Sequence, residues 1–139
     1  MKFKFYDTSS LLLSADTLFE DNENCTILIS SISLQELEKI KTSTTKDATI
    51  KHAARVLLHK LDEYIDDYIC ILYYDNLQKR YLTDLELNND AKIIACALDW
   101  LEDSPDDEDF TFYTNDLAMK QLVRLLLPTV KITSIKPNK

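Results

Sequence analysis

Residues 2–13 read KFKFYDTSSLLL: an alternating run of strand length leads through one acidic residue, Asp7, into an apolar run of helical character. Four further runs have strand length and β-branched or aromatic content: 25–30, 69–74, 110–114 and 130–134. Helical patterns separate the strands: 9–13, 33–41, 47–65, 90–101 and 117–126. Strands that alternate with helices predict βαβ units, and therefore an α/β fold with a parallel sheet covered on both faces.

The size and composition of the chain predict one domain over residues 1–139. Its 139 residues are 45% hydrophobic, which is enough for a single core. The three cysteines lie in apolar runs without CxxC pairing, which indicates reduced thiols of a cytoplasmic protein rather than a disulfide framework or a zinc site. We expect neither secretion nor a membrane span, because the sequence contains no signal-peptide pattern and no apolar run of spanning length.

Glycine is absent from the chain, which excludes several classes of protein. Loops that cradle phosphate need glycine, so neither a nucleotide-triphosphate loop nor a dinucleotide-binding turn can form. Turns with positive φ must then use asparagine. The formal charge of -8 argues against a broad basic face for duplex nucleic acid, but an acidic cleft can still reach phosphate through bound cations.

Four acidic residues come from separate segments and occupy related positions. Asp7 and Asp116 each follow a predicted strand, and Glu36 and Asp90 lie near the starts of predicted helices. Ligands of open parallel sheets collect beyond the carboxyl ends of the strands, so these acids are expected to converge. Their mutual repulsion is relieved by a hard divalent cation such as Mg²⁺ or Mn²⁺, which also activates water against a phosphodiester. The pattern predicts metal-assisted phosphodiester hydrolysis.

Each acid also has a purely structural explanation. Glu36 completes a capping box that begins at Ser33. Asp90 and Asp116 lie at predicted helix N-termini, where the helix dipole favours a negative charge. Asp7 is harder to explain in this way, because the nearby backbone amides are its only evident capping partners.

Taken together, the four acidic segments resemble the PIN domain family of metal-dependent ribonucleases. FYDTSSLLL looks like the family's opening strand and Asp motif, ISLQELEKIK like its Glu-bearing helix, NNDAKIIACAL like its third-acid motif and FYTNDLAMKQL like its closing (S/T)xD motif. The order and spacing cover nearly the whole chain. The residues around the later three acids, with AARVLLHKLDE between them, are most similar to the PIN domain at the N-terminus of PhoH-type ATPases.

This resemblance implies a three-layer α/β/α sandwich around a five-stranded parallel sheet of order 3-2-1-4-5. It also implies a Mg²⁺ or Mn²⁺ site and single-stranded RNA as substrate. Metal-binding or water-activating roles fall on four residues: Asp7, Glu36, Asp90 and Asp116. Thr114 is then a supporting hydroxyl, and Ser9 stands where the family often has asparagine.

The resemblance bears on partners as well. Many family members pair as homodimers, and the ATPase half of PhoH-type proteins is not encoded in this chain, so such a domain would be fused or associated. An alternative function is a catalytically weakened PIN-like module that binds RNA or protein within a PhoH-type or toxin–antitoxin assembly. Ser9 and the acidic surface are the features that favour this alternative.

One segment reverses the acidic sign of the chain. Six of the sixteen basic residues lie within 37–60. Lys51 and Arg55 are four residues apart on a predicted helix, and Lys46 precedes it. We expect these three residues to bind RNA phosphates, although an ordinary solvated helix face explains them equally.

Overall fold

The computed structural model describes residues 2–20, 22–75, 88–103 and 109–136. Ten helices and strands follow one another in these ranges: β1 (Lys2–Tyr6), α1 (Thr8–Leu13), β2 (Cys25–Ser30), α2 (Ser31–Lys41), α3 (Ala48–Tyr64), β3 (Ile69–Leu72), α4 (Asn89–Glu102), β4 (Asp109–Tyr113), α5 (Leu117–Leu126) and β5 (Lys131–Thr133). None of the described helices combines the length and apolar character needed to cross a membrane.

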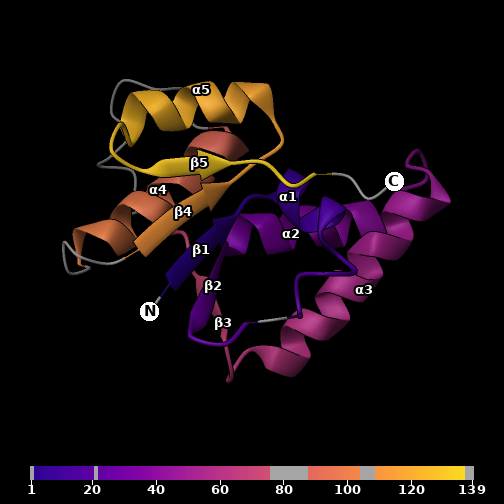
Figure 1. The fold of residues 1–139 in the computed structure, drawn as a ribbon. Helices are drawn as coiled ribbons and strands as arrows, with labels where there is room; N and C mark the ends of the chain where they lie inside the picture. Colours follow the sequence, from indigo (N-terminus) through magenta and orange to yellow (C-terminus); the bar gives the residue numbers. More distant parts are fainter. Residues whose placement is uncertain (1, 21, 76–87, 104–108, 137–139) are drawn as a thin grey trace.

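The strands form one parallel sheet in the order β3-β2-β1-β4-β5 (Figure 1). The predicted fold class and strand order are therefore confirmed. β1 is the central strand, and β4 lies directly beside it, so the segments that follow these two strands start next to each other. This adjacency brings residues from the two ends of the chain to one rim of the sheet.

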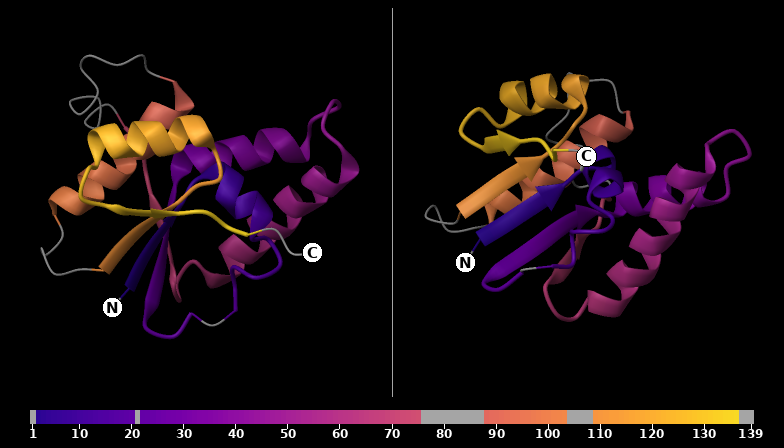
Figure 2. Two further views of the ribbon diagram at one scale, coloured as in Figure 1. Left: turned by 45° about the horizontal axis from the view of Figure 1, so that its top comes forward. Right: turned by 45° about the vertical axis from the view of Figure 1, so that its right-hand side comes forward.

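Two large apolar clusters of the described residues hold the layers together, one on each face of the sheet. Phe5 and Phe112 are adjacent on neighbouring strands and pack against α4 and α5. On the other face, Ile27 and Ile29 of β2 belong to a cluster with residues of α1 and α3. Figure 2 shows the sheet and its helices from two further directions. Alternate strand residues thus face opposite layers, as expected for a sheet between helices.

Several element ends differ from the sequence prediction by one or two residues. α2 begins at Ser31 rather than at residue 33, because the side chain of Ser30 caps it by accepting a hydrogen bond from the Ser33 amide at 3.1 Å. The proposed capping box between Ser33 and Glu36 is therefore wrong, since both residues lie inside the helix. Asn24 adopts positive φ (55°), as predicted for a chain that must use asparagine where others use glycine.

Candidate active site

The four predicted acids line one hollow of about 220 Å³ at the carboxyl rim of the sheet. Each comes from a different segment: Asp7 follows β1, Glu36 lies on α2, Asp90 lies in the first turn of α4 and Asp116 precedes α5. The structure thus brings together side chains that are far apart in sequence. We call this hollow the acid hollow.

Asp7 is buried at the base of the acid hollow, with 2% of its surface exposed. Its Oδ1 accepts hydrogen bonds from the Ser10 amide and from the Ser9 hydroxyl, both at 2.9 Å. Its Oδ2 accepts a hydrogen bond from the Thr114 hydroxyl. Asp7 therefore caps α1, as its structural explanation predicts, and it also lines the acid hollow.

Thr114 connects the two acids that follow neighbouring strands. Its side chain is fully buried, and its Oγ1 donates to Asp7 while accepting from the Asp116 amide at 3.1 Å. Asp116 in turn caps α5: its Oδ1 accepts from the amides of Ala118 and Met119 at 2.9 and 3.3 Å. One threonine hydroxyl thus fixes the positions of both acids.

Ser9 makes a second connection between the same two segments. Its hydroxyl donates to Asp7 and accepts a hydrogen bond from the Asn115 amide at 3.1 Å. A serine can therefore join the segments after β1 and β4 at the position where asparagine was expected from the family pattern.

Glu36 is held by a residue that the sequence reasoning missed. The Thr8 hydroxyl donates to Glu36 Oε1 at 2.6 Å, and Ser33 Oγ lies 3.0 Å from the same threonine oxygen. Thr8 also lines the acid hollow. The position of Thr8 directly after Asp7 could have suggested a role at the site. Its contact with Glu36, 28 residues away, could not be predicted from the sequence.

The pKa of Asp90 is affected by the other three acids. Partial burial raises the pKa of its carboxyl group above the ordinary aspartate value, and the negative charges of Asp116, Glu36 and Asp7 raise it further. Asn88 rather than Asp90 caps α4, so the Asp90 carboxylate is not used as a cap. The negative charges of the other three acids therefore act on the carboxyl group of Asp90.

The donor chemistry of the acid hollow fits a hard divalent cation. Its polar side chains carry carboxylate and hydroxyl oxygens, which Mg²⁺ and Mn²⁺ prefer, and none of the described residues that line it carries an imidazole or a thiolate. Within the described ranges, however, no group of three or more His, Cys, Asp or Glu side chains is arranged so that it could hold an ion as it stands.

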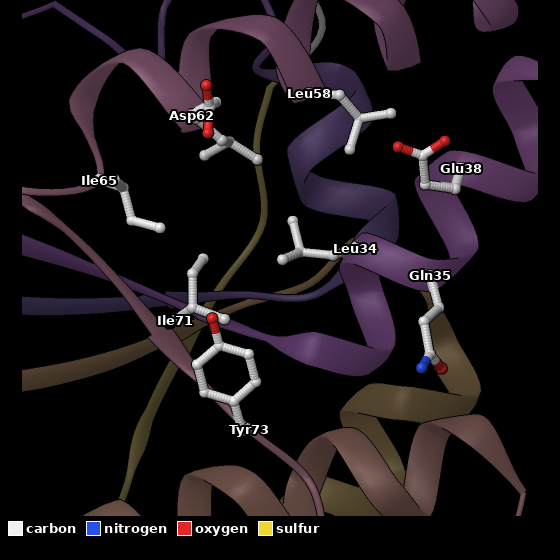
Figure 3. Close-up of a pocket in the computed structure, with 9 residues that line it drawn as sticks. Leu34, Gln35, Glu38, Leu58, Asp62, Ile65, Ile71 and Tyr73 are labelled. Carbon is white, nitrogen blue, oxygen red and sulfur yellow. The ribbon is translucent and has the colours of Figure 1, made fainter.

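A larger hollow of about 430 Å³ lies between α2, α3 and β3 and shares no lining residue with the acid hollow. Figure 3 shows the apolar side chains of Leu34, Leu58 and Ile71 around its centre. Glu38 at its margin is paired with Lys41 at 2.9 Å. Because this groove is mainly apolar, the groups suited to hydrolytic chemistry belong to the smaller acid hollow.

The three basic residues predicted to bind RNA lie outside the acid hollow. Lys46 is exposed in the turn that joins α2 to α3, and this turn projects from the body of the molecule (Figures 1 and 2). Lys51 is half-buried and Arg55 is exposed in the first half of α3. The structure does not bring any of them among the residues that line the hollow.

Comparison with known proteins agrees with the geometry. The sequence model of a family described as PIN domain matches residues 5–124. No curated protein sequence matches the chain.

Three solved structures illustrate the likeness. A domain of a functionally unknown protein from Methanocaldococcus jannaschii has a TM-score of 0.63 at 17% identity, covering 100% of this chain and 94% of that one. VapBC2 from Rickettsia felis, solved bound to a DNA fragment from its promoter, has a TM-score of 0.57 at 18% identity, covering 95% and 98%. VapBC-1 from nontypeable Haemophilus influenzae has a TM-score of 0.56 at 13% identity, covering 95% and 97%. At such identities the likeness concerns the fold.

Proposed function

The chain belongs to the PIN domain family, and from this we propose that it is a metal-dependent ribonuclease that hydrolyses phosphodiester bonds in single-stranded RNA. The observation that carries the proposal is the convergence of four carboxylates from four elements on one hollow. Like charges are costly to gather, and a site for a divalent cation explains why they are gathered.

In this proposal the residues that hold Mg²⁺ or Mn²⁺ are Asp7, Glu36, Asp90 and Asp116. When bound, such an ion neutralises the carboxylates, binds phosphate oxygen and lowers the pKa of water for attack on phosphorus. Hydroxyl groups already orient two of these acids, since Thr114 and Ser9 fix the two oxygens of Asp7 and Thr8 holds Glu36.

We propose that RNA approaches the protein along three basic residues near the start of α3: Lys46, Lys51 and Arg55. Lys46 and Arg55 are exposed, and Lys51 is half-buried, so all three have at least part of their side chains at the surface. The turn that carries Lys46 projects from the body of the molecule (Figure 1), so it can contact an RNA strand from outside. Their role is to attract phosphate, since the hollow itself is negative.

The finer assignments remain part of the same proposal. We expect residues 1–139 to form one domain that acts on cytoplasmic RNA, either alone or beside an ATPase domain as in PhoH-type proteins. Pairing with a second copy has a candidate surface on α5, where Leu117 and Leu125 are 68% and 69% exposed and two turns apart.

A second candidate function is an interaction module with weak or no catalysis, working with a protein partner as in a toxin–antitoxin pair. Two of the matching structures are VapBC proteins, which favours a partner. Ser9 in place of asparagine favours weakened catalysis.

One assay separates the two functions. Cleavage of a single-stranded RNA is measured with Mn²⁺ for the wild type, for Asp7→Asn and for Asp47→Asn. Asp47 is the matched control, because it caps α3 through Oδ1, with a bond of 2.9 Å to the Ile50 amide, and lies outside the acid hollow. The ribonuclease proposal predicts activity in the wild type and in Asp47→Asn, with a loss of at least about 100-fold in Asp7→Asn. A wild type that is inactive with every divalent ion supports the interaction module.

A further inference from the structure

The face of β1, β4 and β5 opposite the phenylalanine core is polar and opens into a hollow of about 320 Å³. Strand register places its residues in rows: Lys4 lies beside Thr111, which lies beside Lys131, and Tyr113 in the next row lies beside Thr133. Figure 1 looks onto these strands, and no described helix lies over β4 or β5 in that view. Parallel sheets are normally covered on both faces, so this opening calls for an explanation.

Three lysines give this hollow a positive charge in a protein of formal charge -8. Lys2 and Lys131 are exposed, Lys4 is half-buried, and Thr111 between the strands is 9% exposed. Asp109 is the acid that lines the hollow, and no ion pair joins the three lysines to a carboxylate of the described residues. We call this hollow the lysine hollow.

The spacing of the lysines exceeds what one phosphate can bridge. Lys4 and Lys131 are on strands separated by β4, and therefore stand about 10 Å apart at their backbones. Lys2 is two residues before Lys4, about 7 Å along the same strand. Three cations spread in this way suit several phosphates of one chain better than a single small anion.

An aromatic ring borders the lysine hollow on the side of the acid hollow. Tyr113 lines it and stacks on Tyr6, with ring centroids 4.5 Å apart and planes inclined by 6°. The carbonyl of Tyr113 accepts a hydrogen bond from the Asp7 amide at 3.1 Å, so the two hollows adjoin through the backbone. Cations along a groove together with an aromatic face are the features that bind single-stranded nucleic acid.

We propose that the lysine hollow is an accessory site for single-stranded RNA, in which Lys2, Lys4 and Lys131 bind backbone phosphates and Tyr113 contacts a base. The identity of the polymer rests on the proposed ribonuclease function. An acidic peptide would use the lysines equally well, but the stacked tyrosine and the hydroxyls of Thr111 and Thr133 favour a nucleotide chain. The strand then reaches the acid hollow from the sheet face, since Lys4 precedes Asp7 by about 10 Å.

The test measures binding of a fluorescent 12-nucleotide RNA by anisotropy in EDTA, where hydrolysis cannot intervene. Lys4→Glu/Lys131→Glu is expected to weaken binding by about 10-fold or more and to reduce the salt dependence by a slope of about 1.4. The matched control is Lys120→Glu/Arg124→Glu, which makes the same charge change on α5 at residues that line neither hollow. It is expected to change affinity by less than about 3-fold. Lys4→Gln/Lys131→Gln repeats the test without charge reversal, in case the first variant folds poorly.

Three outcomes overturn the accessory site: a wild type that does not bind the RNA, equal weakening in both charge-reversal variants, or displacement of the RNA by adenosine monophosphate or oligoglutamate as readily as by unlabelled RNA. Mn²⁺-dependent cleavage is measured separately. If the wild type binds RNA through the lysines but does not cleave it, the ribonuclease proposal is contradicted and the accessory site stands. If the wild type cleaves RNA and the Lys4/Lys131 variant binds it normally, only the accessory site is contradicted.

Discussion

Thr114 shows how one hydroxyl organises the acid hollow at the scale of a single residue. It donates to the carboxylate of Asp7 and accepts from the amide of Asp116, and no water can replace it easily because the side chain is fully buried. The hydroxyl therefore contributes both to stability and to the relative position of two acids.

Replacing this hydroxyl with a methyl group tests that role. Thr114→Val leaves the shape of the side chain nearly unchanged but removes both hydrogen bonds, so we expect a loss of about 1–3 kcal/mol in the free energy of unfolding. Urea denaturation measures this loss. Thr114→Ser keeps the hydroxyl and should retain most of the stability and cleavage, and a valine variant as stable and active as the wild type would show that Thr114 does not position the acids.

Asp90 provides a test of the electrostatic coupling in metal-free protein. Its pKa in the folded state is raised by burial and by the three other acids, so its ionised form is less favourable in the folded than in the unfolded chain. The resulting destabilisation is present above the folded pKa and disappears as pH falls through it. Asp90→Asn should therefore raise Tm in EDTA at pH 7 by about 1–2 °C, the carboxyl being partly screened by solvent.

Thermal melts at pH 7 and pH 4 measure this difference for the variant and the wild type. The gain in Tm should shrink toward zero at pH 4, where the wild-type carboxyl is increasingly protonated. A variant that is less stable than the wild type at pH 7 would mean that Asp90 is stabilised by a contact rather than strained by its neighbours.

At the scale of elements, the sequence predicted the order and type of every helix and strand named above. Periodicity defined α3 well because its apolar face repeats over the 17 residues of the helix. The ends were less certain: α2 starts at Ser31 because Ser30 caps it, and α4 is capped by Asn88. Local side-chain hydrogen bonds decide these ends, and several serines and asparagines compete for each of them.

Contacts between elements could not be predicted from the sequence. The bond from Thr8 to Glu36 joins α1 to α2, and the lysine hollow depends on which part of the sheet the helices leave open. The alternation at 2–6 predicts that Lys2 and Lys4 lie on one face of a strand. That this face of β1 and β4 is left uncovered depends on the packing of α1 and α3 over β2, which the sequence does not show. Such features follow from tertiary packing.

The basic half of α3 carries its own prediction. Lys51→Glu/Arg55→Glu should weaken RNA binding in EDTA by about 5-fold or more and leave the thermal stability nearly unchanged, since these residues attract phosphate from the surface. Lys120→Glu/Arg124→Glu on α5 is the control of equal charge. Equal affinities of the two variants for RNA would reduce the α3 residues to an ordinary solvated face.

For the whole molecule, the arrangement of charge is the feature that connects fold and function. A chain of charge -8 gathers four acids at one rim of its sheet and leaves lysines on an adjoining face. The PIN fold makes this possible because its central strand and the neighbouring strand end side by side. The sequence motifs predicted that four acids would lie close together, and Asp7, Glu36, Asp90 and Asp116 do line one hollow. The bound ion remains a prediction.

The most direct test of the account is the location of Mn²⁺ in a crystal of the protein soaked with MnCl₂, read from anomalous scattering. We predict a peak in the acid hollow, with carboxylate oxygens of at least two of the four acids as ligands. A well-ordered acid hollow without a peak, in crystals where Mn²⁺ binds to other carboxylates, would contradict it.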